Sequence, residues 1–343
     1  MMIRIYLLNL IILGVTLWNL TAKAVEVDSA LNKASQSLLV GNLKNVNEAE
    51  TLANSVSVIE PKSKLAHWLK AQSLFIQAGV GFEIDKKDRK FVKEAKARTL
   101  TIPESKIPGN ILALSESENF SEYILLMETT SSRLFVFEND NGIPKLLKSF
   151  YSSIGLFGDR KQKEGDKKTP IGVYQILKEL EKPRADGFLG NTALTLDYPN
   201  ADDKSVGRTG YGIWIHGVPS NVHVRLPRSS DGCLALANSD LVKLKRFVVM
   251  GKSQILIVPK IWWLDLEEWL IQDKMIRELF SGIYITSKGE LSKNANKKLI
   301  AYMRVDPSRP SVAVIQKKSS LFREYWVETE NGFKFNLHER LKD

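Results

Sequence analysis

The chain of 343 residues contains one cysteine, Cys233, and only four histidines. A single cysteine excludes a disulfide within the chain, so the thiol is left without a structural partner. Metal sites need several histidine, cysteine or carboxylate ligands at set spacings, and no such cluster is present. The acidic pair Asp202-Asp203 lacks these additional ligands. The sequence therefore predicts no metal site and no cofactor.

Two further features are missing. Beyond residue 24 the chain has no apolar run long enough to cross a bilayer, which takes about 20 residues. It also lacks a basic stripe interleaved with aromatic residues, so the formal charge of +10 does not predict a nucleic-acid partner. In an exported protein this charge favours an anionic cell-wall polymer or lipid.

The N-terminal segment Met1–Ala24 has the pattern of an export signal. Arg4 precedes an apolar run from Ile5 to Leu20, and Ala22-Lys23-Ala24 fits the A-x-A cleavage motif. We expect cleavage after Ala24, which removes two of the basic residues and lowers the net charge from +10 to +8. The mature protein is then periplasmic or associated with the cell wall and has no transmembrane segment. An uncleaved membrane anchor is the alternative interpretation.

The pattern of residues divides the remainder into three parts. Residues 25–115 form a helical region with a connector, because apolar residues recur there at helical spacing and prolines follow. Residues 116–260 alternate as in β-strands, which predicts a mainly β domain. Its expected strands are Tyr123–Met127, Arg133–Phe137, Lys145–Tyr151, Ile171–Leu177, Ala193–Leu196, Gly212–His216 and Gln254–Val258. One helix is expected after Cys233, capped by Asn238 or Ser239 and ended by Gly251.

Residues 261–343 predict a small α+β module. An amphipathic helix is expected over Trp262–Phe280, with Leu264, Trp269, Ile271 and Ile276 facing inward. Strands are expected over Ser311–Gln316, Phe322–Thr329 and Phe333–Asn336, and Asn331-Gly332 is a hairpin signal. The module has no catalytic cluster, so we expect it to serve binding or assembly into a homodimer.

The chemistry-bearing residues lie close together in the sequence. His216 ends the alternating strand Gly212–His216, which would hold its ring rigidly at the edge of a cleft. Gly232 permits a tight turn before Cys233, and the amides of this turn could point into the site. A thiol becomes a nucleophile when a base lies within reach. We therefore predict that Cys233 is a nucleophile with His216 as its base; a buried, inert cysteine is the alternative.

These residues resemble the signature of the L,D-transpeptidase catalytic domain (YkuD-type) family. His216-Gly217 is followed by Ser230-Asp231-Gly232-Cys233, and Gly158–Lys161 with Glu164–Tyr174 is similar to that domain's other hallmark. The resemblance implies a β-rich, sandwich-like fold, an exported enzyme and peptidoglycan stem peptides as substrate. It implies that Cys233 attacks the carbonyl of the third stem residue and expels the terminal D-alanine. His216 would act as base and the Gly217 carbonyl would orient its ring. Residues expected to bind substrate or the oxyanion are Ser230, Asp231, Gly232 and Arg208.

The chain departs from the family pattern at two positions. Asp231 stands where the family usually has histidine, and Ala235 where most transpeptidases have arginine or asparagine. Alanine there resembles the hydrolytic branch, which includes cell-shape L,D-carboxypeptidases and lipoprotein-releasing amidases. Some cell-shape members also have an N-terminal helical domain and a C-terminal module of the nuclear-transport-factor-2-like type. Transfer to an amine is the first expectation and hydrolysis the second; an inactive wall-binding scaffold or a cysteine protease are readings of other classes.

Overall fold

The computed structural model describes residues 27, 29–39, 42–80, 85–100, 102–281, 283–285, 291–293, 297–329 and 332–342. The predicted signal segment therefore lies outside the described residues. The chain forms two compact units: one spans Met1–Leu100 with Asn221–Leu226, and the other spans Thr101–Ser220 with Pro227–Asp343. The boundary predicted between residues 260 and 261 falls inside the second unit. No helix in the described part of the chain is long and apolar enough to cross a membrane.

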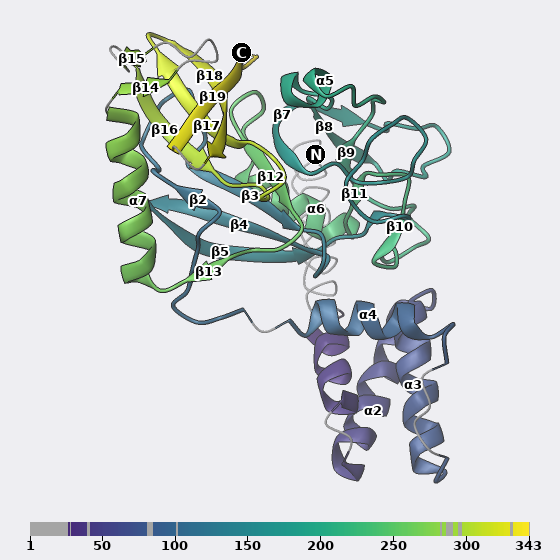
Figure 1. Ribbon diagram of the computed structural model, residues 1–343. Helices are drawn as coiled ribbons and strands as arrows, with labels where there is room; N and C mark the ends of the chain where they lie inside the picture. Colours follow the sequence, from purple (N-terminus) through teal and green to yellow (C-terminus); the bar gives the residue numbers. More distant parts are fainter. Residues whose placement is uncertain are drawn as a thin grey trace, which may run out of the picture. The chain divides into compact units, whose positions relative to one another are not determined.

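The first unit is helical, as predicted (Figure 1). Its helices include residues 29–39, α2 (Leu43–Ile59), α3 (Lys64–Gln77) and α4 (Arg89–Arg98). Asn42 and Ser63 cap α2 and α3 by accepting hydrogen bonds from the amides of Asn45 and Ala66, which satisfies donors that a helix start leaves unpaired. The apolar faces form a core of their own, including Val56, Leu65 and Leu69.

The second unit is built on a mixed sheet that has eight strands among the described residues. The strand order is β11-β9-β8-β7-β12-β3-β4-β5. The strands are β3 (Tyr123–Glu128), β4 (Arg133–Asp140), β5 (Ile143–Tyr151), β7 (Gly172–Glu181), β8 (Thr192–Leu196), β9 (Trp214–His216), β11 (Leu234–Ala235) and β12 (Gln254–Val258). The mainly β fold predicted from the alternating pattern is confirmed, and every predicted strand of this domain is present.

The centre of this sheet is apolar on both faces. Strand β12 is buried at all its positions, and it pairs in parallel with β3 and antiparallel with β7. In the sequence, a central strand that is covered on both faces is a continuous run of apolar residues and does not alternate between apolar and polar ones. Helix α6 (Asn238–Leu244) and a short 3-10 turn, η1 (Lys245–Phe247), connect β11 to this strand. The predicted helix thus ends well before Gly251, and its N-cap is Ala237.

The C-terminal part packs helix α7 (Leu266–Ser281) with a second sheet (Figure 1). The sheet order is β15-β14-β19-β18-β17-β16-β2, so a strand of the connector, β2 (Ile111–Leu112), completes it. The other strands are β14 (Ile283–Ile285), β15 (Leu291–Lys293), β16 (Lys298–Met303), β17 (Ser311–Lys317), β18 (Ser320–Thr329) and β19 (Gly332–Arg340). Asn331 of the predicted hairpin turn lies outside the described residues.

Two predictions for α7 were wrong: the helix begins at Leu266, so Leu264 lies before it in strand β13 (Trp263–Leu264), and one predicted inward residue faces outward. Trp269 and Ile276 are buried as expected, but Ile271 is 64% exposed. Trp269, Asp273, Ile276 and Phe280 form the buried face, and this spacing of about one turn places Ile271 on the opposite side. The buried polar member is Asp273, whose carboxylate accepts a hydrogen bond from the Ala113 amide at 2.6 Å.

A buried arginine connects the C-terminal sheet to the eight-stranded sheet. Arg323 on β18 is 1% exposed, and it forms ion pairs with Asp197 and, at 2.8 Å, with Glu339. It also donates to the carbonyl of Val173 on β7 at 2.7 Å. Burial acts to lower the pKa of Arg323, but the carboxylate of Asp197 and the other groups outweigh it and raise the pKa. The two sheets therefore share a paired buried charge as well as one apolar core.

Candidate active site

The predicted base, His216, is the last residue of strand β9. Ile215 is fully buried, and the strand lies between β8 and β11, with Ala193 opposite His216 on one side and Ala235 opposite it on the other. His216 itself is 1% exposed. Its backbone carbonyl accepts a hydrogen bond from the Leu236 amide at 2.9 Å. The position of the histidine is thus set by pairing on both edges of its strand.

The imidazole is held by the next residue. His216 Nδ1 lies 2.6 Å from the carbonyl oxygen of Gly217. A carbonyl can only accept a hydrogen bond, so Nδ1 carries the hydrogen and donates. The lone pair of the neutral ring then belongs to Nε2. This is the tautomer that a base needs if Nε2 is to accept a proton from a thiol.

Asn238 supports this arrangement, and the sequence had suggested only a capping role for it. Its Oδ1 accepts from the Val218 amide at 3.0 Å, and its Nδ2 donates to the Val218 carbonyl at 2.8 Å. A Cβ atom on Gly217 would lie 2.1 Å from Oδ1 of Asn238, and one on Gly190 would lie 2.7 Å from it. Only glycine fits at these two positions while Asn238 stays in place. Asn238 is therefore a positioning residue for the segment whose carbonyl orients His216.

A network of hydrogen bonds fixes the turn before Cys233. Ser230 Oγ accepts from the Gly232 amide at 3.2 Å and donates to the Cys233 carbonyl at 2.6 Å. Thr169 Oγ1 donates to the Gly232 carbonyl at 2.9 Å. Gly232 has a φ of +123°, a conformation that favours glycine. The Gly232 amide is thus engaged by Ser230, and the oxyanion roles of Ser230 and Gly232 stay predictions.

The thiol of Cys233 is half-buried and contacts the histidine strand. Its Sγ donates to the Gly212 carbonyl at 3.3 Å and accepts from the Trp214 amide at 3.4 Å. Ala235 pairs with His216 in parallel, and Cys233 lies two residues before Ala235, beside Trp214. Cys233 directly precedes β11 (Leu234–Ala235), so it lies beside the start of β9, two residues along the strand from His216. The structure therefore brings the predicted nucleophile and base to one edge of the sheet.

The loop Lys161–Thr169 lies beside the cysteine turn and is organised by Asp166. Burial acts to raise the pKa of Asp166, but hydrogen bonds from Lys161 and from the amides of Gln162, Lys163 and Lys168 outweigh it and lower the pKa to about 2. The Lys161 contact measures 2.8 Å. Beyond it, Lys167 reaches Asp231 at 3.5 Å, and both side chains are exposed, by 47% and 75%. The predicted substrate residue Asp231 is thus a surface carboxylate at the cysteine turn.

Arg208 occupies a different environment. Its Nη1 lies 3.5 Å from both Asp202 and Asp203, which belong to α5 (Ala201–Ser205). Asp203 also accepts from the Tyr174 hydroxyl at 3.0 Å and pairs with Arg309. Burial raises the pKa of Asp203 despite these cations. Arg208 is therefore part of an ion-pair cluster, and its substrate role stays a prediction. In the described part of the chain, no group of three or more histidine, cysteine or acidic residues could hold a metal ion.

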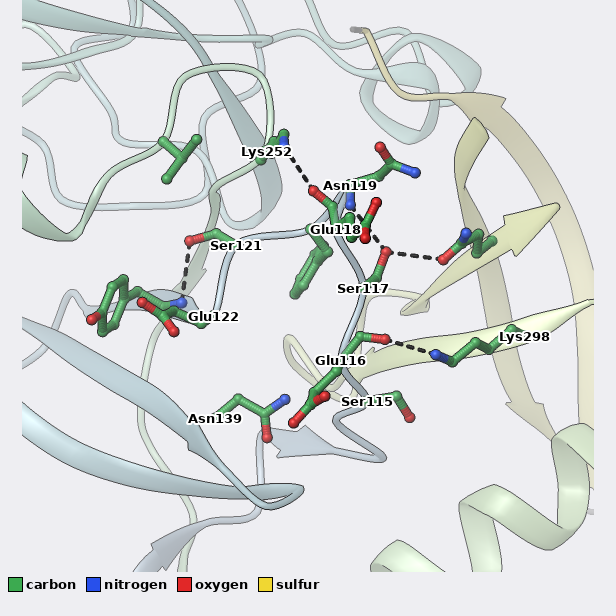
Figure 2. A pocket seen from close by; sticks show the side chains of 14 residues that line it. Ser115, Glu116, Ser117, Glu118, Asn119, Ser121, Glu122, Asn139, Lys252 and Lys298 are labelled. Carbon is green, nitrogen blue, oxygen red and sulfur yellow. Dashed lines mark hydrogen bonds between the residues drawn. The ribbon is translucent and has the colours of Figure 1, made fainter. Parts of the chain in front are cut away.

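A polar cavity of about 790 Å³ lies at the connector and does not include Cys233 or His216. Figure 2 shows Lys252 and Lys298 reaching the backbone of its wall; they donate to the carbonyls of Glu118 and Glu116, each at 2.7 Å. Its lining is mostly serine, asparagine and glutamate side chains. Because the cavity lacks both predicted catalytic residues, the candidate active site remains the edge of the sheet next to Cys233 and His216.

Comparison with known proteins gives a family match for the part of the chain that contains Cys233 and His216. The family of the L,D-transpeptidase catalytic domain (YkuD) matches residues 122–257. "Putative L,D-transpeptidase YafK" of Escherichia coli K12 is 30% identical over 88 residues, which are 26% of this chain and 31% of the relative. The chain thus spans about a third of the length of the curated relatives that it matches. The predicted resemblance is confirmed for the domain that contains both His216 and Cys233.

Two solved structures are similar in fold. Bd1075 of Bdellovibrio bacteriovorus aligns with a TM-score of 0.54 at 21% identity, over 69% of this chain and 99% of that one. A point mutant of Pgp2, a helical cell shape determining protein from Campylobacter jejuni, aligns with a TM-score of 0.47 at 21% identity, over 75% of this chain and 100% of that one. At this identity the Bd1075 alignment supports the fold alone.

Proposed function

We propose that this chain is an exported, peptidoglycan-modifying cysteine enzyme that forms an acyl-enzyme on Cys233 with a stem tetrapeptide. One observation carries the proposal. The His216 ring donates through Nδ1 to the Gly217 carbonyl, so its Nε2 is the basic nitrogen, and the Cys233 thiol bonds the backbone of Gly212 and Trp214, the segment that leads to His216. A nucleophile, a base and a group that orients the base are the parts that thiol catalysis requires.

The chemistry follows from these parts. Nε2 of His216 takes the thiol proton, and the Cys233 sulfur attacks the carbonyl carbon of the third stem residue. The resulting oxyanion collapses, the bond to the terminal D-alanine breaks, and the imidazolium returns its proton to the departing amine. A thioester between Cys233 and the tripeptide remains. The Trp214 amide, which donates to Sγ, would stabilise the thiolate before attack.

The acyl group then passes to an amine acceptor, which gives a transpeptidase, the activity for which the family is named. Hydrolysis is the second candidate, and two observations favour it. Asp231 presents an exposed carboxylate two residues before the nucleophile, where it could orient a water molecule. Ala235 is fully buried and supplies no polar atom for holding an acceptor. The same acyl-enzyme serves both outcomes.

The proposed location is the periplasm or the cell wall, because the substrate lies there and Met1–Ala24 has the pattern of an export signal. The family match supports peptidoglycan as partner. The C-terminal module would serve substrate binding or homodimer formation.

The test is incubation of the purified enzyme with tetrapeptide muropeptides, with and without an added D-amino acid, followed by mass analysis. Exchanged or cross-linked product supports transfer, whereas tripeptide alone in both reactions supports hydrolysis. The matched control is Cys233→Ala, which should lose all turnover and keep its fold, because a small residue replaces a small one at a half-buried position. Turnover by Cys233→Ala would refute the mechanism, and no turnover by the wild type would favour an inactive wall-binding scaffold.

A further inference from the structure

A rigid basic loop borders the cysteine turn, and the mechanism above gives it no role. The Asp166 carboxylate accepts from the amides of Gln162 at 2.7 Å, Lys163 at 3.1 Å and Lys168 at 3.1 Å, and from Lys161 Nζ at 2.8 Å. These bonds close the loop around one carboxylate. Lys167 lies inside it with a φ of +52°, a conformation that a lysine adopts only when its surroundings impose it.

The loop is packed tightly against the nucleophile's own turn. A Cβ atom on Gly232 would lie 2.7 Å from the Lys168 carbonyl oxygen, and one on Gly155 would lie 2.4 Å from the Lys167 carbonyl oxygen. The Lys167 carbonyl also accepts from the Phe157 amide at 3.2 Å. Backbone meets backbone here, and Thr169 at the end of the loop donates to the Gly232 carbonyl, so the loop is bonded to the residue before Cys233. The position of Lys167 is therefore coupled to that of the thiol.

Lys167 retains the capacity to bind a second carboxylate. Its Nζ is 3.5 Å from Asp231, two residues before Cys233, and its side chain is 47% exposed. An exposed pair of this kind is weak, about 0–1 kcal/mol. An ammonium group has three N–H donors, and its contact with Asp231 uses one of them. Asp231 thus holds the ammonium beside the cysteine turn, and the partly exposed Lys167 side chain keeps donors for a further acceptor.

We propose that Lys167 binds the terminal carboxylate of the peptide substrate and so selects chains that end one residue beyond the scissile bond. The inference rests on the proposed function, in which the leaving residue is a terminal D-alanine. Its carboxylate lies one residue, about 3.8 Å along the chain, beyond the attacked carbonyl. Lys167 pairs with Asp231, which precedes Cys233 by two residues, so it supplies a cation for the substrate carboxylate beside the turn that holds the thiol. A peptide that continues past this point offers an uncharged amide instead and loses the ion pair.

The test compares two ligands that differ only in this charge. Binding of a stem tetrapeptide with a free C-terminal carboxylate, and of the same peptide as C-terminal carboxamide, is measured by calorimetry on the full chain carrying Cys233→Ala, which needs no turnover. Lys167→Gln should weaken carboxylate binding by roughly 5- to 30-fold, the range for a charged hydrogen bond that becomes partly shielded on binding. Binding of the carboxamide should change by less than about twofold.

Two further variants sharpen the result. Asp231→Asn removes the competing negative charge, so carboxylate binding should tighten a few-fold while carboxamide binding stays the same. Lys163→Gln, another exposed lysine of the same loop, is the matched control and should leave both affinities unchanged. Equal weakening of both ligands by Lys167→Gln, or no binding of either by a folded Cys233→Ala protein, would overturn the inference. Turnover by the wild-type enzyme without any preference for the carboxylate would overturn it while leaving the proposed function intact.

Discussion

The contact between Gly217 and Asn238 allows the support of the base to be tested by a double-mutant cycle. Gly217→Ala places a methyl group 2.1 Å from Asn238 Oδ1 and 3.3 Å from its Cγ. Asn238 cannot rotate away at little cost, because its amide forms two hydrogen bonds with the Val218 backbone. We therefore expect Gly217→Ala to destabilise the protein by about 1–3 kcal/mol, the usual cost of overpacking.

Asn238→Ala removes both hydrogen bonds, and at about 0.5–1.5 kcal/mol each it should cost about 1–3 kcal/mol. It also removes the side chain that the Gly217→Ala methyl group would strike. The double variant should therefore be no less stable than Asn238→Ala alone. Its loss of stability should be about 1–3 kcal/mol smaller than the sum of the losses in the two single variants. Urea unfolding of the four proteins measures this cycle. Additive losses would refute the claim that Asn238 holds the Gly217 segment in place.

The same cycle has a functional readout. Gly217→Ala displaces the carbonyl that accepts from His216 Nδ1, so kcat should fall with little change in KM. A misplaced base costs up to the roughly 10²–10⁴-fold that general-base catalysis contributes. Asn238→Ala should partly restore kcat in the Gly217→Ala background. A fall in kcat that tracks only the loss of folded protein would show a structural role without an effect on the base.

Two other predictions concern the surroundings of the site. Arg323→Met should lower the free energy of unfolding by about 3–5 kcal/mol, because it leaves the carboxylates of Asp197 and Glu339 without their buried cation. Urea unfolding measures this loss, with Lys318→Met at an exposed site as the control. Equal stability of the two variants would contradict the prediction. Asp166 has its pKa lowered from 3.8 to about 2, so its contribution of roughly 2 kcal/mol is present above pH 4 and lost as the pH falls toward 2. Asp166→Asn should therefore be less stable at pH 6 and lose less stability between pH 4 and 2, and parallel pH profiles for the two proteins would refute the assignment.

The sequence predicted the strands well because each has a local pattern. Strands such as Gln254–Val258 are short apolar runs bounded by turn residues, and the structure has the same bounds. The prediction that His216 and Cys233 act together came from a sequence motif with a characteristic spacing, and it stays a prediction. Periodicity was less reliable for α7, where Ile271 fits an apolar stripe in sequence but lies 64% exposed.

Contacts between distant residues could not be predicted in this way. Asn238 at a helix start has the composition of a cap, yet its side chain bonds Val218, 20 residues away. Arg323 and Asp197 are 126 residues apart, and neither has a local pattern that indicates burial. The close approach of Asn238 to two glycines depends on how the start of α6 meets the two loops that contain Gly190 and Gly217. Such features arise from tertiary packing, which overrides local preference.

The most direct test of the central claim uses the fact that Cys233 is the only cysteine. The rate of its alkylation by iodoacetamide at pH 7, followed by intact-protein mass spectrometry, reports how much reactive thiolate His216 maintains. The account predicts rapid single alkylation of the wild type and a rate lower by roughly tenfold or more in His216→Ala, with both proteins folded. Equal rates in the two proteins would contradict the claim that His216 activates Cys233.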